Sequence, residues 1–302
     1  MKFRHVLEYV GARTVLAFFR ILPVRIGAQI GSAWGAVAFR VDARHRRLAL
    51  WNLSKSDADR GPAENRRIVG RLYRHLGMML AEIAHMHRRD EVNAWTSVEG
   101  EEHLRAALAK GRGVIIVVAH FGNWELAGAV CALHVPDVRV VAFPQRNPLV
   151  DRMICGIREA AGMKVLLTGA AAKPILRAVK ENAVIGILAD QDVAERGVFV
   201  HLLGRPAATS HGPSVLAHRA EAPVLTAFLT RVGPARHHFQ YQAEVPMTGD
   251  AVADTQAIAD RLSAAVREHP DQWLWLHDRW KTVRRPDGSI ARERNPPLDF
   301  RE

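Results

Sequence analysis

Five short apolar runs that alternate with helical segments constrain the fold of this chain more than any other feature. The runs are rich in Val, Ile and Leu, as are strands that lie buried inside a parallel sheet. This alternation predicts an α/β sheet with mostly parallel strands. The runs cover 114–118, 138–142, 164–167, 184–188 and 224–229, with helices expected near 123–133, 149–161, 171–181 and 212–220.

The segments around these runs complete a single predicted domain. Helical spacing of apolar residues extends over 62–96, 101–110 and 255–268, and 238–244 is expected to be an antiparallel edge strand. We therefore predict one α/β domain over residues 51–283, with a mostly parallel mixed sheet flanked by helices. Residues 284–302 are rich in Arg, Pro and Asp and are expected to form a loose polar C-terminal tail.

Residues 1–50 form an N-terminal apolar extension that differs in composition from the domain. Two mostly apolar helices joined at Leu22-Pro23 are expected, with Arg13 and Arg20 on one face of the first. The longest uncharged stretch, 26–39, is shorter than the roughly 20 residues that a bilayer span needs. We expect these helices to lie in a membrane interface. Packing on the domain core alone is one alternative, and a single span with snorkelling arginines is another.

The charge of the chain favours an anionic partner. Lys and Arg number 42 against 31 Asp and Glu, a net charge of +11. Such a surplus suits nucleic acid, an acidic membrane surface or an acidic carrier protein. No RNA-binding aromatic motif or zinc finger is present in the sequence, so we do not expect nucleic acid. A basic cluster at the end of the extension suits the anionic lipids of the cytoplasmic leaflet; its members are Arg40, Arg44, Arg46 and Arg47.

The segment 117–128, VVAHFGNWELAG, places a histidine directly after the first apolar run. In one continuous helix His120 and Glu125 would lie roughly 140° apart and would not easily meet. If His120 lies in the strand-to-helix turn and Glu125 in the first helical turn, their side chains can meet. Both then lie beside the free N–H groups of a helix N-terminus. We therefore predict a catalytic base with its orienting carboxylate at this turn.

Polar residues also follow two other strands of the predicted sheet. Asp190-Gln191-Asp192 comes after the strand 184–188, and FPQRNP at 143–148 comes after the strand 138–142. Ligands of open parallel sheets bind beyond the carboxyl ends of the strands. We therefore expect the three polar segments to converge on one rim. Asp190 and Asp192 have no third acid close by in sequence, so a metal site is not expected.

The sequence lacks several motifs, and their absence limits which reactions the protein is expected to catalyse. It contains no GxSxG, GxGxxG or GxxxxGK segment, and Cys131 falls within an apolar helix. The two cysteines, Cys131 and Cys155, are expected to be small core side chains. We expect His120 to take the proton of an external hydroxyl as it attacks a thioester, while Glu125 holds the ring tautomer. Helix N–H groups or Arg146 would stabilise the oxyanion in this direct acyl transfer.

The segment AHFGNWELAG resembles the His-x4-Asp/Glu motif of the lysophospholipid acyltransferase superfamily. Its Phe-Gly-Asn-Trp filling is similar to the late acyltransferases of lipid A biosynthesis, the lauroyl and myristoyl transferases. The resemblance covers roughly residues 15–283. The other segments that carry it are RNPLVDR at 146–152, LADQD at 188–192, GRPAAT at 204–209, GPSVLAHR at 212–219, APV at 222–224 and PDQWLWLHDRWK at 270–281.

The resemblance implies a glycerol-3-phosphate acyltransferase-like fold and an enzyme at the cytoplasmic face of the cell inner membrane. It implies transfer of a fatty acyl chain from acyl carrier protein to a hydroxyl of an anionic lipid A precursor, without metal or cofactor. Carried over, His120 is the base and Glu125 its partner. The residues implied to line the substrate rim are Asn123, Arg146, Asn147, Asp190 and Gln191.

Some questions stay open at the level of sequence. Phe143 and Leu202-Leu203 depart from the family pattern, and this bears on donor chain length and acceptor identity. Another lipid acceptor (a lysophospholipid, ornithine lipid or glycolipid), a non-catalytic lipid-binding protein and a hydrolase that uses water are the alternatives. Trp273, Trp275 and Trp280 suit either core packing or an interfacial belt. Arg205 and Arg279 suit either phosphate contact or a solvated surface.

Overall fold

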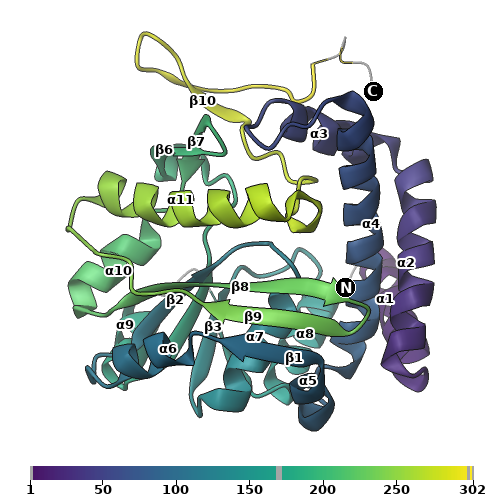
Figure 1. Ribbon diagram of the computed structural model, residues 1–302, viewed down its shortest axis with the longest axis horizontal. Coiled ribbons are helices and arrows are strands. Elements are labelled where there is room, and N and C mark those ends of the chain that lie inside the picture. The colour runs from purple at the N-terminus through teal and green to yellow at the C-terminus, as the bar shows by residue number, and fades with distance from the viewer. Residues whose placement is uncertain (1–2, 168–171, 298–299, 301–302) are drawn as a thin grey trace.

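The computed structural model describes residues 3–167, 172–297 and 300, which form helices packed around a central sheet (Figure 1). The helices are α1 (Phe3–Ile21), α2 (Val24–Val41), α3 (Ala43–Ser54), α4 (Pro62–His85), α5 (Arg89–Trp95), α6 (Glu101–Leu108), α7 (Trp124–His134), α8 (Pro148–Ala160), α9 (Ala172–Lys180), α10 (Gly212–Ala220) and α11 (Ala251–Glu268). Residue 171, the expected start of the ninth helix, lies outside the described residues.

The main sheet has the strand order β1-β9-β8-β2-β5-β3-β4, and β8–β9 is its antiparallel pair. Its strands are β1 (Thr96–Glu99), β2 (Val114–Val118), β3 (Val138–Ala142), β4 (Met163–Leu167), β5 (Val184–Leu188), β8 (Val224–Gly233) and β9 (Arg236–Tyr241). Two hairpins lie outside it: β6 (Val198–Leu202) with β7 (Arg205–Thr209), and β10 (Thr282–Arg284) with β11 (Ile290–Arg292). The predicted mostly parallel α/β sheet is confirmed.

Successive side chains of a strand point to opposite faces of the sheet, so they pack into two separate hydrophobic cores. Val114 and Ile116 of β2 pack with α5, α6 and α7 on one face of the sheet. Ile115 and Val117 pack with α9, α10 and α11 on the other. The central strands are thus apolar on both sides, which explains why their sequences are continuous hydrophobic runs.

Two expectations about the C-terminal part of the chain, the edge strand and the loose tail, are corrected. The antiparallel strand expected over 238–244 is β9, but it is not the edge, because the four residues of β1 pair with its outer side in parallel. The expected loose tail after residue 283 instead begins with the β10–β11 hairpin. A four-residue strand next to a helix is too short to leave a clear sequence pattern.

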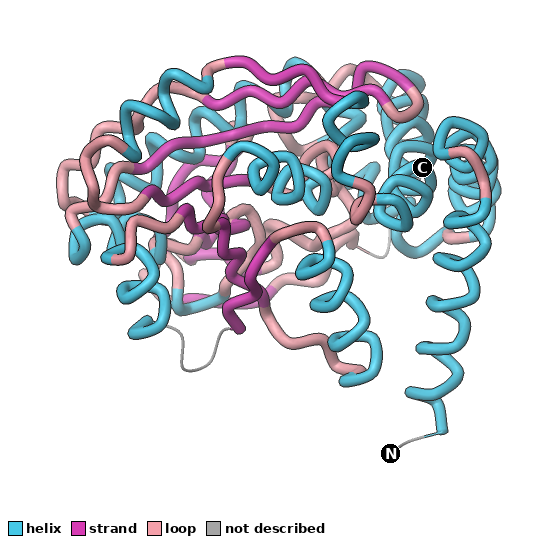
Figure 2. Tube along the Cα trace, turned by 90° about the horizontal axis from the view of Figure 1, so that it is seen from below, coloured by secondary structure: helices cyan, strands magenta, loops and turns pink. Residues whose placement is uncertain are grey.

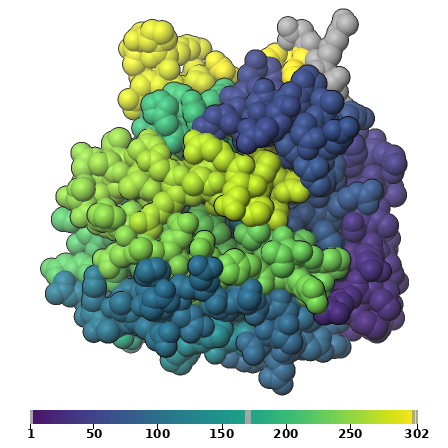
Figure 3. All heavy atoms as spheres, in the orientation of Figure 1, coloured from purple at the N-terminus to yellow at the C-terminus, as the bar shows by residue number. Residues whose placement is uncertain are grey.

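The N-terminal helices pack on α4 along one edge of the molecule (Figure 3). Small residues allow α2 and α4 to touch backbone to backbone: a Cβ built on Gly31 would lie 2.2 Å from the carbonyl oxygen of Gly77. Large apolar side chains on the outer faces of α1 and α2 nevertheless stay exposed, among them Phe3, Ile21, Val37 and Val41. Figure 2 shows the N-terminal part of α1 extending beyond the body of the molecule.

Within the described residues, no helix is both long and apolar enough to cross a bilayer.

Candidate active site

His120 lies in the turn between β2 and α7, as the sequence predicts. The next residues form a tight connection in which Gly122 has a φ of +57°, and a Cβ at this position would lie 1.6 Å from the carbonyl oxygen of Leu229. Only glycine fits such a left-handed, crowded position. Asn123 then caps α7 by accepting a hydrogen bond from the Leu126 N–H at 3.1 Å. Glu125 therefore falls in the first helical turn.

The carboxylate that contacts His120 belongs to Asp190. The Nδ1 atom of His120 lies 2.7 Å from Asp190 Oδ1, and the backbone N–H of His120 donates to Oδ2 at 3.0 Å. Because an ionised carboxylate only accepts hydrogen bonds, Nδ1 carries the proton and Nε2 is the basic nitrogen. The side-chain nitrogen of Gln191 lies 3.3 Å from Nε2. The predicted convergence of residues after neighbouring strands is confirmed for β2 and β5.

The surroundings of Asp190 keep it ionised. Its Oδ2 also accepts a hydrogen bond from the Trp273 indole N–H at 2.8 Å. Burial opposes the charge, but His120 and Trp273 outweigh burial and lower the pKa of Asp190 to about 2. Burial likewise disfavours protonation of His120, yet the Asp190 carboxylate outweighs it and raises the pKa of His120 above its usual 6.5. The imidazolium form is thus stabilised, as general-base catalysis requires.

The expectation that Glu125 orients the ring of His120 is corrected. Both oxygens of Glu125 accept hydrogen bonds from the Arg158 guanidinium, at 2.6 and 2.8 Å, and this bidentate ion pair joins α7 to α8. A planar guanidinium matches a carboxylate better than a ring nitrogen does, so Arg158 takes the side chain. Glu125 still helps to raise the pKa of His120 through its charge. Its catalytic role stays a prediction.

The other residues expected at the substrate rim divide into two groups. Arg146 is exposed and Gln191 faces His120, so both are accessible to a ligand. Asn123 and Asn147 are buried, and their amides are used within the fold. Asn147 caps α8 and donates to the carbonyl of His5 and to Glu8, both at 2.9 Å, which ties α8 to α1. The rim position expected for these two asparagines is therefore corrected.

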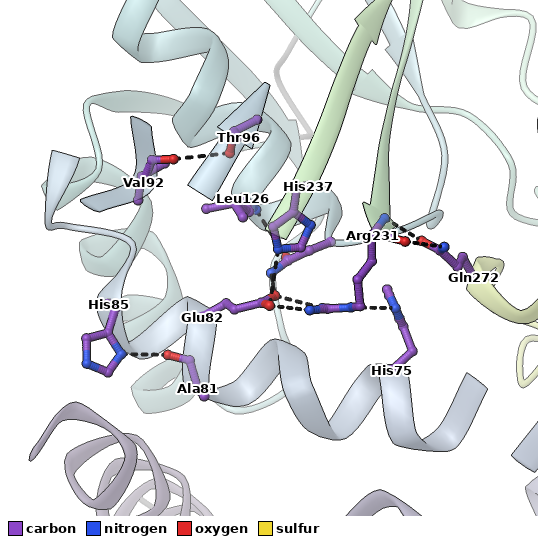
Figure 4. A network of polar contacts seen from close by, with 11 residues as sticks. His75, Ala81, Glu82, His85, Val92, Thr96, Leu126, Arg231, His237 and Gln272 are labelled. Carbon is purple, nitrogen blue, oxygen red and sulfur yellow. Dashed lines mark hydrogen bonds and ion pairs between the residues drawn. The ribbon is translucent and has the colours of Figure 1, made fainter. Parts of the chain in front are cut away.

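Asn123 belongs to a buried ionic network that sequence reasoning missed, and Figure 4 shows its members Glu82 and Arg231. Its amide donates to Glu82 of α4 at 2.8 Å, and Glu82 forms a two-pronged ion pair with Arg231 of β8. Arg231 also donates from Nε to the Nδ1 of His75 at 3.0 Å, and His237 Nε2 lies 3.1 Å from Glu82. Burial opposes the Glu82 charge, but Arg231 and His237 outweigh it and hold the pKa of Glu82 below its usual range.

This network fixes the start of α7 against α4 and the sheet. Glu82 lies in the otherwise mostly apolar helical segment LAEIAH, and this charged residue was the sequence signal that could have indicated a buried network. Arg231 comes two residues after the expected strand 224–229, and nothing in the sequence around it indicated that it belongs to this network.

The C-terminal segment covers the back of His120. Phe121 and Trp273 form an antiparallel bridge, and the Leu274 N–H donates to the His120 carbonyl at 3.0 Å. The three tryptophans are 0–2 % exposed and pack edge to face, so core packing is confirmed over an interfacial belt. Arg279 is also buried and donates to the Ala208 carbonyl at 2.8 Å, so it is neither a solvated charge nor free to bind phosphate.

An apolar pocket opens beside the turn that carries His120. It holds about 630 Å³ of empty space, including its open mouth, and Glu125 and Arg158 are its charged lining residues. Trp124 lines this pocket, and its ring centroid lies 5.1 Å from that of His120. Cys131 lies deep in the wall, where burial raises the pKa of its thiol to about 11, in keeping with a small core side chain. The remaining lining includes Ile116, Val118, Gly128, Val140, Met163, Gly186 and Leu188.

Among the described residues, no group of three or more His, Cys, Asp or Glu side chains is arranged to hold a metal ion. The carboxylate of Asp192 instead accepts hydrogen bonds from the Ala194 N–H and the Thr282 hydroxyl.

Comparison with known proteins places this fold and site in one class. The model of the bacterial lipid A biosynthesis acyltransferase family matches residues 2–282, so the chain belongs to this family and is an acyltransferase that acts on a lipid acceptor. It is 29 % identical to the lipid A biosynthesis lauroyltransferase of Escherichia coli over 279 residues, which cover 90 % of each chain.

The chain is also similar to two further acyltransferases. The chain is 25 % identical to the lipid A biosynthesis myristoyltransferase of Escherichia coli over 290 residues, 93 % of this chain and 89 % of the relative. It is 30 % identical to the phosphatidylinositol mannoside acyltransferase of Mycobacterium tuberculosis over 187 residues, 61 % of this chain and 59 % of the relative.

Proposed function

We propose that this protein transfers a fatty acyl chain from acyl carrier protein to a hydroxyl of a lipid A precursor, with His120 as the general base. The observation that carries the proposal is the His120–Asp190 pair, which leaves Nε2 as a basic nitrogen, a few residues before Trp124 and Glu125, which line an apolar pocket. A base beside a site for a hydrocarbon chain is the minimum that acyl transfer to a lipid alcohol needs.

The proposed reaction is a direct displacement. His120 Nε2 takes the proton of the acceptor hydroxyl as its oxygen bonds to the thioester carbonyl carbon. The tetrahedral intermediate collapses, the carbon–sulfur bond breaks, and the imidazolium returns its proton to the departing thiolate. Asp190 stabilises the imidazolium and keeps Nδ1 protonated throughout, as the carboxylate of a His–acid pair does.

Glu125 and Arg158 have separate parts in this proposal. The acyl chain lies in the apolar pocket, where its carbonyl end contacts the charged pair that also lines this pocket. The Arg158 guanidinium is a donor for the developing oxyanion, and Glu125 holds it in place by the bidentate contact. This assigns to Arg158 the part that the sequence suggested for Arg146.

The net charge and the names of the relatives support the proposed acyl donor and acceptor. An acidic carrier protein and a phosphorylated lipid are both anionic, which suits a net charge of +11. Three relatives are named for lipid A biosynthesis over nine-tenths of this chain or nearly so. The exposed apolar faces of α1 and α2 support attachment to the cytoplasmic face of the cell inner membrane. A phosphatidylinositol mannoside-type glycolipid is the second candidate acceptor, because one relative is named for it.

The test has two parts. Lipid A mass spectra from cells with and without the protein should differ by one acyl group, and the purified enzyme should form that product from acyl carrier protein thioester. The variant His120→Asn should abolish product formation, while His201→Asn, a surface histidine on β6, should not. Acyl-carrier-protein consumption without a lipid product would indicate a hydrolase and contradict the proposal, and an unchanged lipid A with an altered glycolipid would favour the second acceptor.

A further inference from the structure

A second cavity lies on the opposite side of α8 from the catalytic pocket. It is a groove between α1, the C-terminal end of α4 and α8, with about 1420 Å³ of empty space including the part open to solvent. None of its lining residues also lines the catalytic pocket. On α8, Arg158 faces the catalytic pocket, while Met153, Gly156 and Ile157 face the groove.

The groove is basic at its rim. Arg13 and Arg20 of α1 and Arg152 of α8 line it, and its lining contains no Asp or Glu. Within the part of the chain that the structure describes, no hydrogen bond or ion pair joins these three guanidiniums to a carboxylate. Arg13 donates to the Tyr9 hydroxyl at 2.9 Å, and Arg20 donates to the His87 ring at 3.3 Å. Burial and the charges of Arg20 and Arg88 lower the pKa of His87, which marks the excess of positive charge.

The floor of the groove is apolar. Its members are Leu16, Ala17, Ile83, Ala84, Leu149, Met153, Gly156 and Ile157. A Cβ built on Gly156 would meet nothing within 4 Å, so open space lies directly above this helix position. Three arginines around a hydrocarbon surface match a molecule that has both an anionic head and an apolar tail.

The outer face of α1 indicates where that molecule comes from. At about 100° per residue, the exposed Phe3, Leu7 and Val10 lie roughly 100° around the helix from the arginines of the groove. This apolar stripe lies in the N-terminal half of α1, the helix whose N-terminal end extends beyond the body of the molecule in Figure 2. Side chains of this kind enter the hydrocarbon of a bilayer while neighbouring arginines reach the phosphates.

We propose that the α1–α8 groove binds one anionic phospholipid of the bilayer, with its phosphate among Arg13, Arg20 and Arg152 and its acyl chains over Gly156. The lipid is an attachment point and not a substrate, because α8 separates it from Glu125, Arg158 and His120.

Two sets of variants test the groove. Arg13→Gln, Arg20→Gln and Arg152→Gln are combined in one protein, and the matched control combines Arg196→Gln, Arg219→Gln and Arg292→Gln, which are exposed elsewhere and remove the same charge. Gly156→Trp fills the floor without changing charge, and Gly156→Ala is its control. Thermal unfolding of each variant establishes that it is folded.

Binding is measured by calorimetry with monomeric dihexanoyl phosphatidylglycerol, dihexanoyl phosphatidylcholine and inorganic phosphate. We expect the phosphatidylglycerol to bind at least tenfold more tightly than the other two. The groove triple variant and Gly156→Trp should each bind phosphatidylglycerol at least tenfold more weakly than the wild type. The two controls should bind it within about twofold of the wild-type affinity. Equal binding of the zwitterionic lipid or of inorganic phosphate, or an equal loss in the control triple, would overturn the proposal.

Acyl transfer with detergent-dispersed substrates separates this groove from the acceptor site. The groove triple variant should retain wild-type turnover in that assay. A loss of turnover there would assign the groove to the acceptor and overturn the attachment role. Because lipid binding is read without turnover, a failure of the proposed acyl transfer would leave the binding result intact.

Discussion

Asp190 and His120, 70 residues apart in sequence, meet at 2.7 Å because β2 and β5 are neighbours in the sheet and both end at the same edge. The contact fixes which ring nitrogen is basic and sets the direction of its pKa shift. The pH dependence of the reaction should therefore report the pKa of His120 in its contact with Asp190.

The first prediction concerns the wild-type pH profile. Because His120 must be neutral to accept a proton and its pKa is raised, kcat/KM should rise with pH through a midpoint above 6.5. Initial rates between pH 5 and 9, with buffers of constant ionic strength, measure the midpoint. A midpoint clearly below 6.5 would contradict the assignment of His120 as the base.

Replacement of Asp190 by Asn should lower that midpoint and reduce the rate. The variant removes the largest contribution that raises the pKa of His120 and weakens the preference for the Nδ1–H tautomer, so kcat should fall about 10²–10⁴-fold. Asp192→Asn, two residues further along the chain after the same strand, is the control and should keep the midpoint. A rate within threefold of wild type for Asp190→Asn would refute the role of this carboxylate.

Glu125 and Arg158 should behave as one unit. If Glu125 acts by holding Arg158, then Glu125→Gln, Arg158→Gln and the double variant should have similar kcat values, a coupling of about 0.5–3 kcal/mol. Glu125→Gln should lower the midpoint less than Asp190→Asn does, since its charge contributes less to the pKa of His120. An equal shift would show instead that Glu125 contacts His120 during catalysis.

The buried network around Glu82 should dominate local stability. Glu82→Gln leaves the Arg231 charge without its carboxylate, which costs about 3–5 kcal/mol, whereas Glu64→Gln in an exposed pair should cost far less. Because the pKa of Glu82 is lowered, its contribution is present above pH 4.5 and is lost as the pH falls further. Urea unfolding at pH 7 measures the difference, and equal costs for the two variants would contradict it.

The apolar pocket should set the length of the acyl chain. A Cβ at Gly186 of β5 would lie 3.4 Å from Val140 Cγ1, so Gly186→Ala fits and Gly186→Leu occupies the pocket. We expect the leucine variant to prefer acyl donors shorter by several carbons, with a tenfold change in relative kcat/KM, and the alanine variant to change little. Competition between acyl carrier protein thioesters of different lengths measures this ratio. Unchanged selectivity would place the acyl chain elsewhere.

The sequence predicted the central sheet well because its buried strands leave continuous apolar runs. The runs 114–118, 138–142 and 184–188 match β2, β3 and β5 residue for residue. The carboxyl-end rule also placed Asp190 near His120. What failed was the choice between two carboxylates: Glu125 is closer in sequence, but strand order decides which one reaches the ring. The partners of Asn123 and Asn147 come from α4 and α1, and no local pattern encodes such contacts.

The backbone contact of Gly31 with Gly77 has a mechanical consequence. It holds α2 and α4 in close backbone contact. Glu82, five residues further along α4, accepts a hydrogen bond from Asn123, which caps the helix that follows His120. The N-terminal helices are therefore linked by two direct contacts to the first residues of the helix that follows the His120 turn.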